Sequence, residues 1–409
     1  MTQAATTFGF NPSHASSFRW TMLGLLWFAY FCFGVVSGSI APLITQIGSE
    51  LGLGRSSLGV VMGAWALVYI VAAMPSGTAV DRFGTRLGIA VGILVIAISG
   101  LARAAANDFW TLFAAIAVFG LGGPLISVGA PKVISQWFSG DERGTAMGIY
   151  MTGPYLGTAF AFATANGVFM PLFDGSWRMT LAAFGLVAMA AAVLWMLFAR
   201  EPAPGAGRED ERSPGGFKAF APLLRQDLVR VILVITLAAF MFNHGMMAWL
   251  PSILTARGLD AATAGVWASI PTLIGVASAL IIPRFATPAR GIDILCVLYG
   301  CLVAATLLLA FTHGAGLLFG LTLLGIARVI GAIMLMILMD VPKVGSNNMG
   351  TASGLYFTVG EIGGVLGPTI LGIVADLSGS FVASILTLNV LAVFLFCMTV
   401  PLRRARRGT

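Results

Sequence analysis

The sequence contains little charge, and this scarcity excludes an ordinary water-soluble protein. Only 10% of the 409 residues are Asp, Glu, Lys or Arg, whereas 58% are hydrophobic. The mean hydropathy is +0.94. A soluble domain carries roughly 25% charged residues. Because so few charges cannot cover a water-facing surface, we expect a protein whose solvent is the lipid bilayer.

Cysteine and histidine are scarce too, and the clusters that build enzyme sites are missing. The four cysteines all lie inside apolar runs, so we expect neither a disulfide framework nor a cysteine metal site. The three histidines lack metal-ligand spacing, and no Walker-type phosphate loop is present. We therefore expect no enzyme, no metal, no cofactor and no ATP-driven pump.

Long apolar runs are abundant instead. A helix needs about 20 mostly apolar residues to cross a bilayer, and the sequence contains twelve such runs. They lie near residues 20–43, 57–77, 87–106, 111–133, 144–167, 177–199, 229–251, 262–284, 291–312, 316–340, 352–374 and 378–401. Fifty-one glycines suit close packing of membrane helices. The prediction is an all-α, multi-pass integral membrane protein with twelve transmembrane helices.

The positions of the basic residues predict the orientation. All Lys and Arg residues except Arg55, Arg103, Arg178, Arg257 and Arg328 fall on the side of the N-terminus. This is the positive-inside bias, so the net charge of +7 reflects topology rather than a nucleic-acid partner. Both termini should be cytoplasmic. Arg103 is interpreted as an ordinary boundary charge. A compact chain without a targeting sequence suggests a bacterial inner membrane.

Two nine-residue stretches repeat about half a chain apart: GTAMGIYMT from Gly144 and GTASGLYFT from Gly350. Because six spans separate them, they predict a parallel repeat of two six-helix bundles. Since the bundles pack on each other, a monomer suffices. The predicted parts are a cytoplasmic tail (1–18), a first bundle (19–199), a cytoplasmic linker (200–228), a second bundle (229–401) and a basic tail (402–409).

Two loops carry a family signature. After the second span, GTAVDRFGTR fits the pattern G-x-x-x-D-R-x-G-x-R/K with Gly77, Asp81, Arg82, Gly84 and Arg86. Between spans four and five stand Trp137, Phe138, Glu142, Arg143 and Gly144. With these motifs, the sequence resembles the major facilitator superfamily of secondary transporters over nearly its whole length.

The resemblance implies that these loops form a cytoplasmic latch. In this interpretation Gly77 permits close helix approach, and Asp81 caps a neighbouring helix N-terminus. Arg82 and Arg86 pair with Asp141 or Glu142, and Arg143 belongs to the same cluster. The alternative is that these arginines only set the topology. Pro283 replaces the aspartate in the second copy, so that latch should be lost.

Within the superfamily, short stretches favour one subgroup. FNHGMMAWLPSIL in the seventh span and VGEIGGVLGP in the eleventh resemble the cyanate and 2-nitroimidazole porter group. Many proton-driven drug exporters of the superfamily carry an arginine in the fourth helix, where this chain has Ile116 and Ala117. This difference counts against the exporter interpretation.

Arg328 and Glu361 lie near the middle of spans ten and eleven. An ionisable side chain at that depth costs about 2.5–3.5 kcal/mol on insertion scales, so we treat both residues as candidates for function. Arg328 can bind an oxyanion through its planar fork of donors, and Glu361 can accept a proton. One hypothesis is that protonation of Glu361 releases Arg328 for the anion. The alternative is a permanent structural salt bridge.

Several aromatic and polar residues of the spans complete the candidate substrate site; for Tyr30, Trp65 and Tyr69 the alternative is packing against neighbouring helices. They are Tyr30, Trp65, Tyr69, Tyr155, Asn243 and His244. His244 either contacts solute and titrates or donates one structural hydrogen bond. Tyr150 and Tyr356 occupy equivalent positions in the two halves and are expected to pack.

The function that these patterns favour is secondary active transport of a small anionic solute by alternating access, with protons as one candidate coupling ion. A proton-driven exporter of drugs or hydrophobic metabolites is the first alternative. A solute-binding membrane sensor is the second, although a sensor would carry a sizeable soluble output domain.

Overall fold

The computed structural model describes residues 12–201, 221–287, 290–341 and 349–407. The expected tails and the linker therefore lie partly outside the described residues, and so does the side chain of Asp141 from the expected latch. Within the described ranges the chain forms helices and connecting turns, with no strand.

The described residues of the first half form eight α-helices. They are α1 (Pro12–Gly38), α2 (Ile44–Leu51), α3 (Arg55–Phe83), α4 (Thr85–Ala104), α5 (Phe109–Trp137), α6 (Gly140–Thr164), α7 (Met170–Leu172) and α8 (Trp177–Phe198). Gly84 separates α3 from α4 with φ +87°, a conformation that glycine adopts without steric cost.

Nine more α-helices follow in the part of the second half that the structure describes. They are α9 (Ala221–Leu224), α10 (Asp227–Ala256), α11 (Ala261–Ile281), α12 (Gly291–Phe311), α13 (Ala315–Ala327), α14 (Ile330–Met339), α15 (Met349–Ser378), α16 (Phe381–Cys397) and α17 (Thr399–Arg407). Helices α13 and α14 belong to one apolar segment that a turn at Arg328 and Val329 interrupts.

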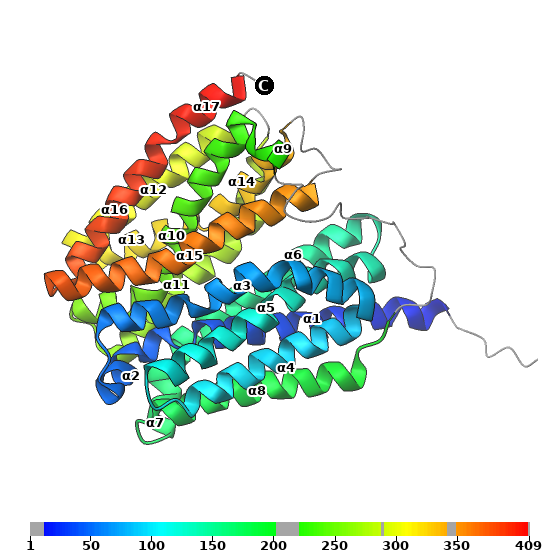
Figure 1. Cartoon of the computed structure of the whole chain (residues 1–409), viewed down its shortest axis with the longest axis horizontal. Coiled ribbons are helices and arrows are strands. Elements are labelled where there is room, and N and C mark those ends of the chain that lie inside the picture. Colours follow the sequence, from blue (N-terminus) through cyan, green and yellow to red (C-terminus); the bar gives the residue numbers. More distant parts are fainter. Residues whose placement is uncertain (1–11, 202–220, 288–289, 342–348, 408–409) are drawn as a thin grey trace, which may run out of the picture.

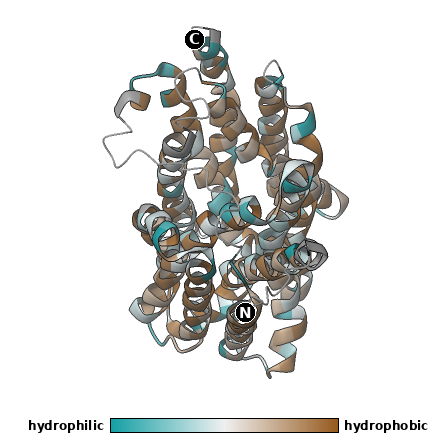
Figure 2. Ribbon diagram, turned by 90° about the vertical axis from the view of Figure 1, so that its right-hand side faces the viewer, coloured by the Kyte–Doolittle hydropathy of each residue, from teal (hydrophilic) through white to brown (hydrophobic). Residues whose placement is uncertain are grey.

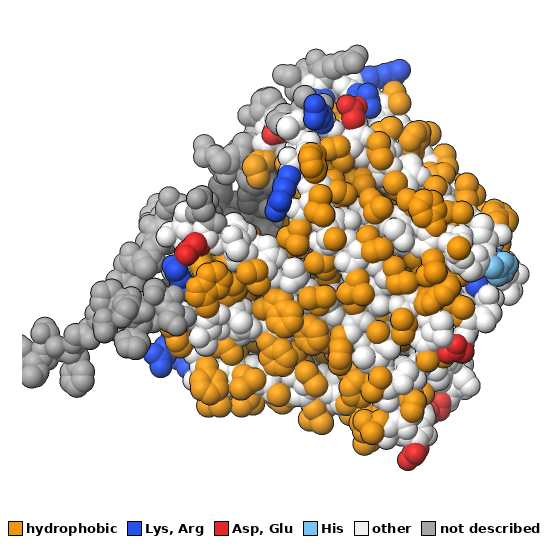
Figure 3. Space-filling model, turned by 180° about the vertical axis from the view of Figure 1, so that it is seen from behind, with side chains coloured by type: hydrophobic (Ala, Val, Ile, Leu, Met, Phe, Trp, Pro, Cys, Tyr) orange, Lys and Arg blue, Asp and Glu red, His pale blue; other side chains and the backbone are white. Residues whose placement is uncertain are grey.

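Eleven helical segments of the described chain are long and apolar enough to cross a membrane. The expected fifth span, 144–167, falls on α6, which is not among these segments. Helix α6 begins with the polar sequence GDERGT and packs against α1 on one side and α11 on the other. Protein contacts on two sides reduce the apolar surface that this helix must offer to lipid. Figure 3 shows hydrophobic side chains over the middle of one face, with charged side chains near its ends.

The two halves form separate groups of helices that meet along two pairs (Figure 1). Helix α3 packs against α15, and α6 packs against α11. Small residues allow this close approach: a Cβ added to Gly59 would lie 2.5 Å from the carbonyl oxygen of Pro368. Glycine at such contacts lets membrane helices approach closely.

The ends of the helices define two faces. We call the end that carries the start of α1 and the C-terminal helix α17 the terminal face, which Figure 2 shows from outside, and the other end the opposite face. At the opposite face the halves are bonded to each other. Asp376 of α15 accepts hydrogen bonds from the backbone N–H groups of Arg55 (3.2 Å) and Ser56 (2.7 Å) of α3. The Arg55 guanidinium donates to the carbonyl of Ala375 at 2.9 Å.

The terminal face has a different pattern. Its described ion pairs each lie within one half: Arg19–Glu142 (2.7 Å) and Lys132–Asp81 (2.6 Å) in the first, Arg403–Asp293 (2.5 Å), Arg406–Asp340 (3.2 Å) and Arg230–Asp227 in the second. These ion pairs therefore do not bridge the halves in this conformation, whereas Asp376 does so at the opposite face.

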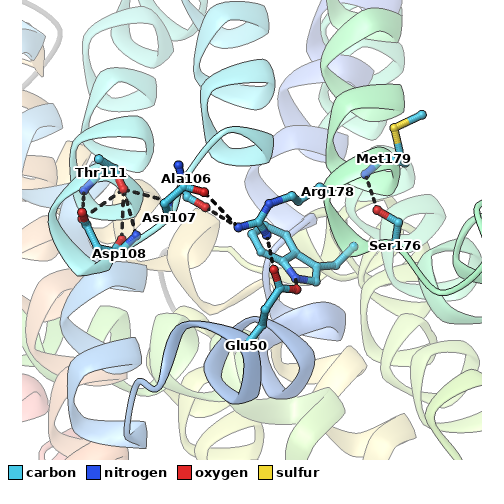
Figure 4. Close-up of polar contacts among 9 residues, drawn as sticks. Glu50, Ala106, Asn107, Asp108, Thr111, Ser176, Arg178 and Met179 are labelled. Carbon is cyan, nitrogen blue, oxygen red and sulfur yellow. Dashed lines mark hydrogen bonds and ion pairs between the residues drawn. The ribbon is translucent and has the colours of Figure 1, made fainter.

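A network within the first half fixes the loops of the opposite face (Figure 4). Glu50 of α2 accepts hydrogen bonds from the Trp177 indole (2.5 Å) and pairs with Arg178 (2.9 Å). Arg178 also donates to the carbonyl of Ala106 at 2.9 Å. Nearby, Asp108 caps α5 and accepts hydrogen bonds from the backbone N–H and the hydroxyl of Thr111, which lower the pKa of Asp108.

Arg103 is buried, although we interpreted it from the sequence as an ordinary boundary charge. Only 1% of its surface is exposed. Its guanidinium donates to the Val36 carbonyl at 2.5 Å and to the Ser39 hydroxyl at 3.1 Å, and it lies over the Phe119 ring. Arg103, which belongs to α4, therefore anchors the C-terminal end of α1. The sequence places it near a helix end but does not show that α1 covers it.

Candidate functional site

A cavity of about 210 Å³ lies between the helices of the second half and α6 of the first half. Most of its wall comes from the second half: α10, α11, α12, α13, α14 and α15 contribute residues, and Arg328 stands between α13 and α14. The first half contributes Tyr155 of α6. A solute in this cavity therefore touches both halves.

Arg328 is the charged residue of the cavity wall. Its Nη1 atom donates to the Met247 sulfur at 2.8 Å, and its Cζ atom lies 5.2 Å from the centroid of the Tyr155 ring. Its Nε atom is buried and has no hydrogen-bond partner. Gly275 of α11 makes room for the side chain, because a Cβ there would lie 2.7 Å from Arg328 Cδ.

The described residues place no carboxylate against Arg328, so the structural salt bridge with Glu361 is not formed. Instead, Oε2 of Glu361 lies 3.8 Å from Nδ1 of His244 on the neighbouring helix α10. The Glu361 side chain is only 8% exposed, and neither of these two atoms has a hydrogen-bond partner. At 3.8 Å the two atoms are within ion-pair range but too far apart for a hydrogen bond, so both remain without a hydrogen-bond partner in this conformation.

Aromatic residues of the first half approach this pair. The Trp65 ring of α3 lies edge-on to the His244 ring, with centroids 5.3 Å apart. Trp65 also contacts Tyr69, with centroids 6.1 Å apart. Tyr69 interacts with the Ser127 side chain and lies near enough to Glu361 for electrostatic interaction. Tyr30 donates to Ser127 Oγ at 3.3 Å and packs on Tyr150.

The structure therefore sorts the predicted site residues into two groups. Arg328, Asn243 and Tyr155 line the cavity. Glu361, His244, Trp65 and Tyr69 form a connected polar and aromatic group, and Tyr30 joins it through Ser127.

Sequence reasoning missed several residues of the site. Met247 contacts Arg328, Ser127 joins two tyrosines, and Tyr356 lines the cavity although we expected it only to pack. Met247 and Ser127 carry no sequence signal that separates them from ordinary packing residues. Tyr356 is 2% exposed and also packs against Phe240, so it has both roles.

The latch residues lie at the terminal face, but their pairing differs from the expectation. Asp81 pairs with Lys132 of α5 rather than capping a helix, and Glu142 pairs with Arg19. Arg86 donates to the carbonyl of Met196 at 2.8 Å, and Arg82 lies over the Phe83 ring. The nearest atom to a Cβ on Gly77 would be 3.9 Å away, so no close approach requires glycine there. Arg143 is exposed.

Residues 26–368 match the family model of the Major Facilitator Superfamily. The match covers more than half of the chain, which therefore belongs to this superfamily. The expectation of a multi-pass membrane transporter rather than an enzyme is confirmed, since its relatives are named as transporters. The chain is a secondary transporter.

Two relatives are similar over most of their length. The hexuronate transporter of Bacillus subtilis is 27% identical over 377 residues, which cover 87% of this chain and 86% of the relative. The probable galactarate/D-glucarate transporter GudP of the same species is 24% identical over 407 residues, which cover 90% and 88%. These names give no support to the expected cyanate and 2-nitroimidazole subgroup.

Solved structures share the fold. The nucleoside transporter NupG superposes with a TM-score of 0.80 at 14% identity, covering 93% of this chain and 99% of that chain. A bacterial homologue of the human lysosomal transporter Spinster gives a TM-score of 0.73 at 17% identity, covering 95% and 98%. At these identities the likeness concerns the all-helical transporter fold alone.

Proposed function

We propose that this protein carries a small organic anion whose acidic group binds Arg328. The observation that carries the proposal is a buried guanidinium that lines a cavity and has no carboxylate partner among the described residues. An uncompensated cation at this depth is costly, and an anionic solute would compensate it. Arginine also matches the geometry of carboxylates through two parallel hydrogen bonds.

The names of the relatives support this class of solute. Hexuronate, galactarate and glucarate are anions of sugar acids. The cyanate and 2-nitroimidazole subgroup is not part of this proposal. The drug exporter is also less favoured, because a cavity of about 210 Å³ is smaller than the roughly 300–1,000 Å³ of drug-sized sites.

We further propose that protons drive transport and that Glu361 carries the coupled proton. The hypothesis that protonation frees Arg328 from Glu361 does not fit this conformation, since the two residues are not paired. The proximity of Glu361 to His244 supports a different route, in which the pair binds the proton beside the cavity.

The remaining organisation follows as part of the proposal. Helix α6 serves as a twelfth span, the two six-helix bundles are 19–199 and 229–401, and the terminal face is cytoplasmic. The protein works as a monomer in a bacterial inner membrane. During alternating access, the hydrogen bonds at Asp376 break, and contacts form between the latch and the second half at the terminal face.

A thermal-stability screen of the detergent-purified full chain tests the anion site. Cyanate, nitrate, glucuronate, glucarate and short monocarboxylates are compared with neutral drugs at equal ionic strength. A ligand that binds only the folded protein stabilises it by about 2.7 kcal/mol at a hundredfold excess over Kd. We expect an anion to raise Tm, Arg328→Ala to abolish the rise, and the exposed control Arg284→Ala to retain it.

The other results separate the alternatives. A Tm rise with neutral hydrophobic compounds alone would favour the exporter. A solute that binds but does not exchange across proteoliposomes would favour the sensor. An anion response that survives in Arg328→Ala would remove Arg328 from the site.

A further inference from the structure

The residues that line the cavity indicate how many charges and polar groups a solute can carry, in addition to the sign of its charge. Among its described lining residues, Arg328 is the one that carries a charge. The Arg328 guanidinium is already engaged by Met247 on Nη1 and by the Tyr155 face. The guanidinium donors that remain can bind one carboxylate. A second carboxylate on the same solute would find no cation in the wall.

The rest of the wall is mostly apolar. Polar groups come from Asn243, Tyr155 and Tyr356, and the Tyr356 hydroxyl already donates to the Gly331 carbonyl at 3.5 Å. Most other lining side chains are aliphatic or thioether groups, among them Met246, Met247, Leu250, Leu302, Leu324 and Ile330. Hydroxyl groups placed against these side chains would lose their hydrogen bonds to water without replacement, which is unfavourable.

We infer that the cavity prefers a monoanion with a short apolar body over dicarboxylates and polyhydroxylated sugar acids. This inference rests on the proposed function, because it assumes that the solute's acidic group binds Arg328. It separates this chain from relatives whose names include galactarate and D-glucarate, which carry two carboxylates and several hydroxyls. Methionine side chains adapt to apolar groups of different shape, so the chain length of the solute matters less than its charge.

Four anions separate the effect of charge from the effect of hydroxyls. Butyrate has one carboxylate and no hydroxyl, glutarate two carboxylates and no hydroxyl, glucuronate one carboxylate with hydroxyls, and glucarate two with hydroxyls. Each is titrated against the purified full chain, with Tm as the readout and ionic strength held constant. We expect butyrate to reach its half-maximal Tm shift at about tenfold lower concentration than the others, equivalent to about 1.4 kcal/mol.

A variant with a second cation provides the matched test. Asn243 lines the cavity and is exposed within it, so Asn243→Lys adds charge without removing a buried packing group. This variant should shift the preference from butyrate towards glutarate, whereas Arg284→Lys, outside the cavity, should leave the order unchanged.

The results distinguish this inference from the proposed function. A preference of the wild type for glucarate or glucuronate would overturn the monoanion inference while leaving the anion site intact, provided that Arg328→Ala still abolishes the response. An unchanged preference in Asn243→Lys would also count against it. If none of the four anions shifts Tm, the inference falls together with the proposed anion site.

Discussion

Ser56 at the start of α3 and Asp376 near the end of α15 are joined by two hydrogen bonds across the two halves of the protein. The backbone N–H and the hydroxyl of Ser56 both donate to Oδ2 of Asp376, at 2.7 and 2.6 Å. Asp376 thereby caps the first turn of a helix that belongs to the other half. These bonds must break whenever the opposite face opens.

Asp376→Ala is therefore expected to loosen the opposite face. Loss of a helix-capping side chain costs about 1 kcal/mol, so the amides at Arg55 and Ser56 should exchange hydrogen several-fold faster by mass spectrometry. Asp376→Asn keeps an acceptor oxygen and should have a smaller effect. Equal exchange rates in wild type and Asp376→Ala would show that this contact does not hold the face closed.

Glu361→Gln should uncouple anion binding from pH. The carboxamide cannot take up a proton, whereas wild-type Glu361 faces His244 on α10 and Tyr69 on α3, and Arg328 acts on His244 electrostatically. The test is a Tm titration with propanesulfonate, whose own charge is constant, at values from roughly pH 5 to pH 8. The apparent affinity should vary with pH in wild type and in the exposed control Glu201→Gln. Persistence of that variation in Glu361→Gln would exclude Glu361 as the coupled group.

Gly363→Ala should destabilise the second half. A Cβ at this position would collide with the carbonyl oxygen of Leu237 on α10, a backbone atom that cannot rotate away. Overpacking of this kind costs about 1–3 kcal/mol, which should appear as a lower Tm. Gly354→Ala on the same helix is the control, since nothing lies within 4 Å of its added Cβ. A Tm of Gly363→Ala equal to that of the control would contradict the close packing of α10 on α15.

Asp108→Asn should remove a pH-dependent contribution to stability. Hydrogen bonds from Thr111 lower the folded-state pKa of Asp108. Its contribution is therefore present above the unfolded pKa of about 3.9 and is lost as pH falls through the folded pKa. The Tm difference between wild type and Asp108→Asn should shrink as pH decreases below about 4.

The exposed Asp174 provides the control for this experiment. Its backbone has φ 52°, which asparagine tolerates. Asp174→Asn removes the same charge at an exposed position and so controls for the change in net charge. A constant Tm difference for Asp108→Asn across the same pH range would argue against a stabilising cap.

The contacts between side chains inside the site could not be predicted from the sequence. The mid-span positions of Arg328 and Glu361 marked both residues as candidates, and Tyr155 was a further candidate. In the structure Tyr155 covers Arg328, and Glu361 faces His244. A position along a helix gives the depth of a side chain but not which neighbouring helix it meets.

The sequence by itself determined the class of this protein. Long apolar runs, sparse charge and the half-length repeat require helices that satisfy their own backbone hydrogen bonds in lipid, and the loop motifs indicate the superfamily. The tertiary structure decided the partners of the charged side chains. Asp81 meets Lys132, Arg103 is covered by α1, and Arg328 has no carboxylate partner among the described residues. These outcomes depend on how the helices rotate and cross, which close packing of distant segments sets and local sequence does not encode.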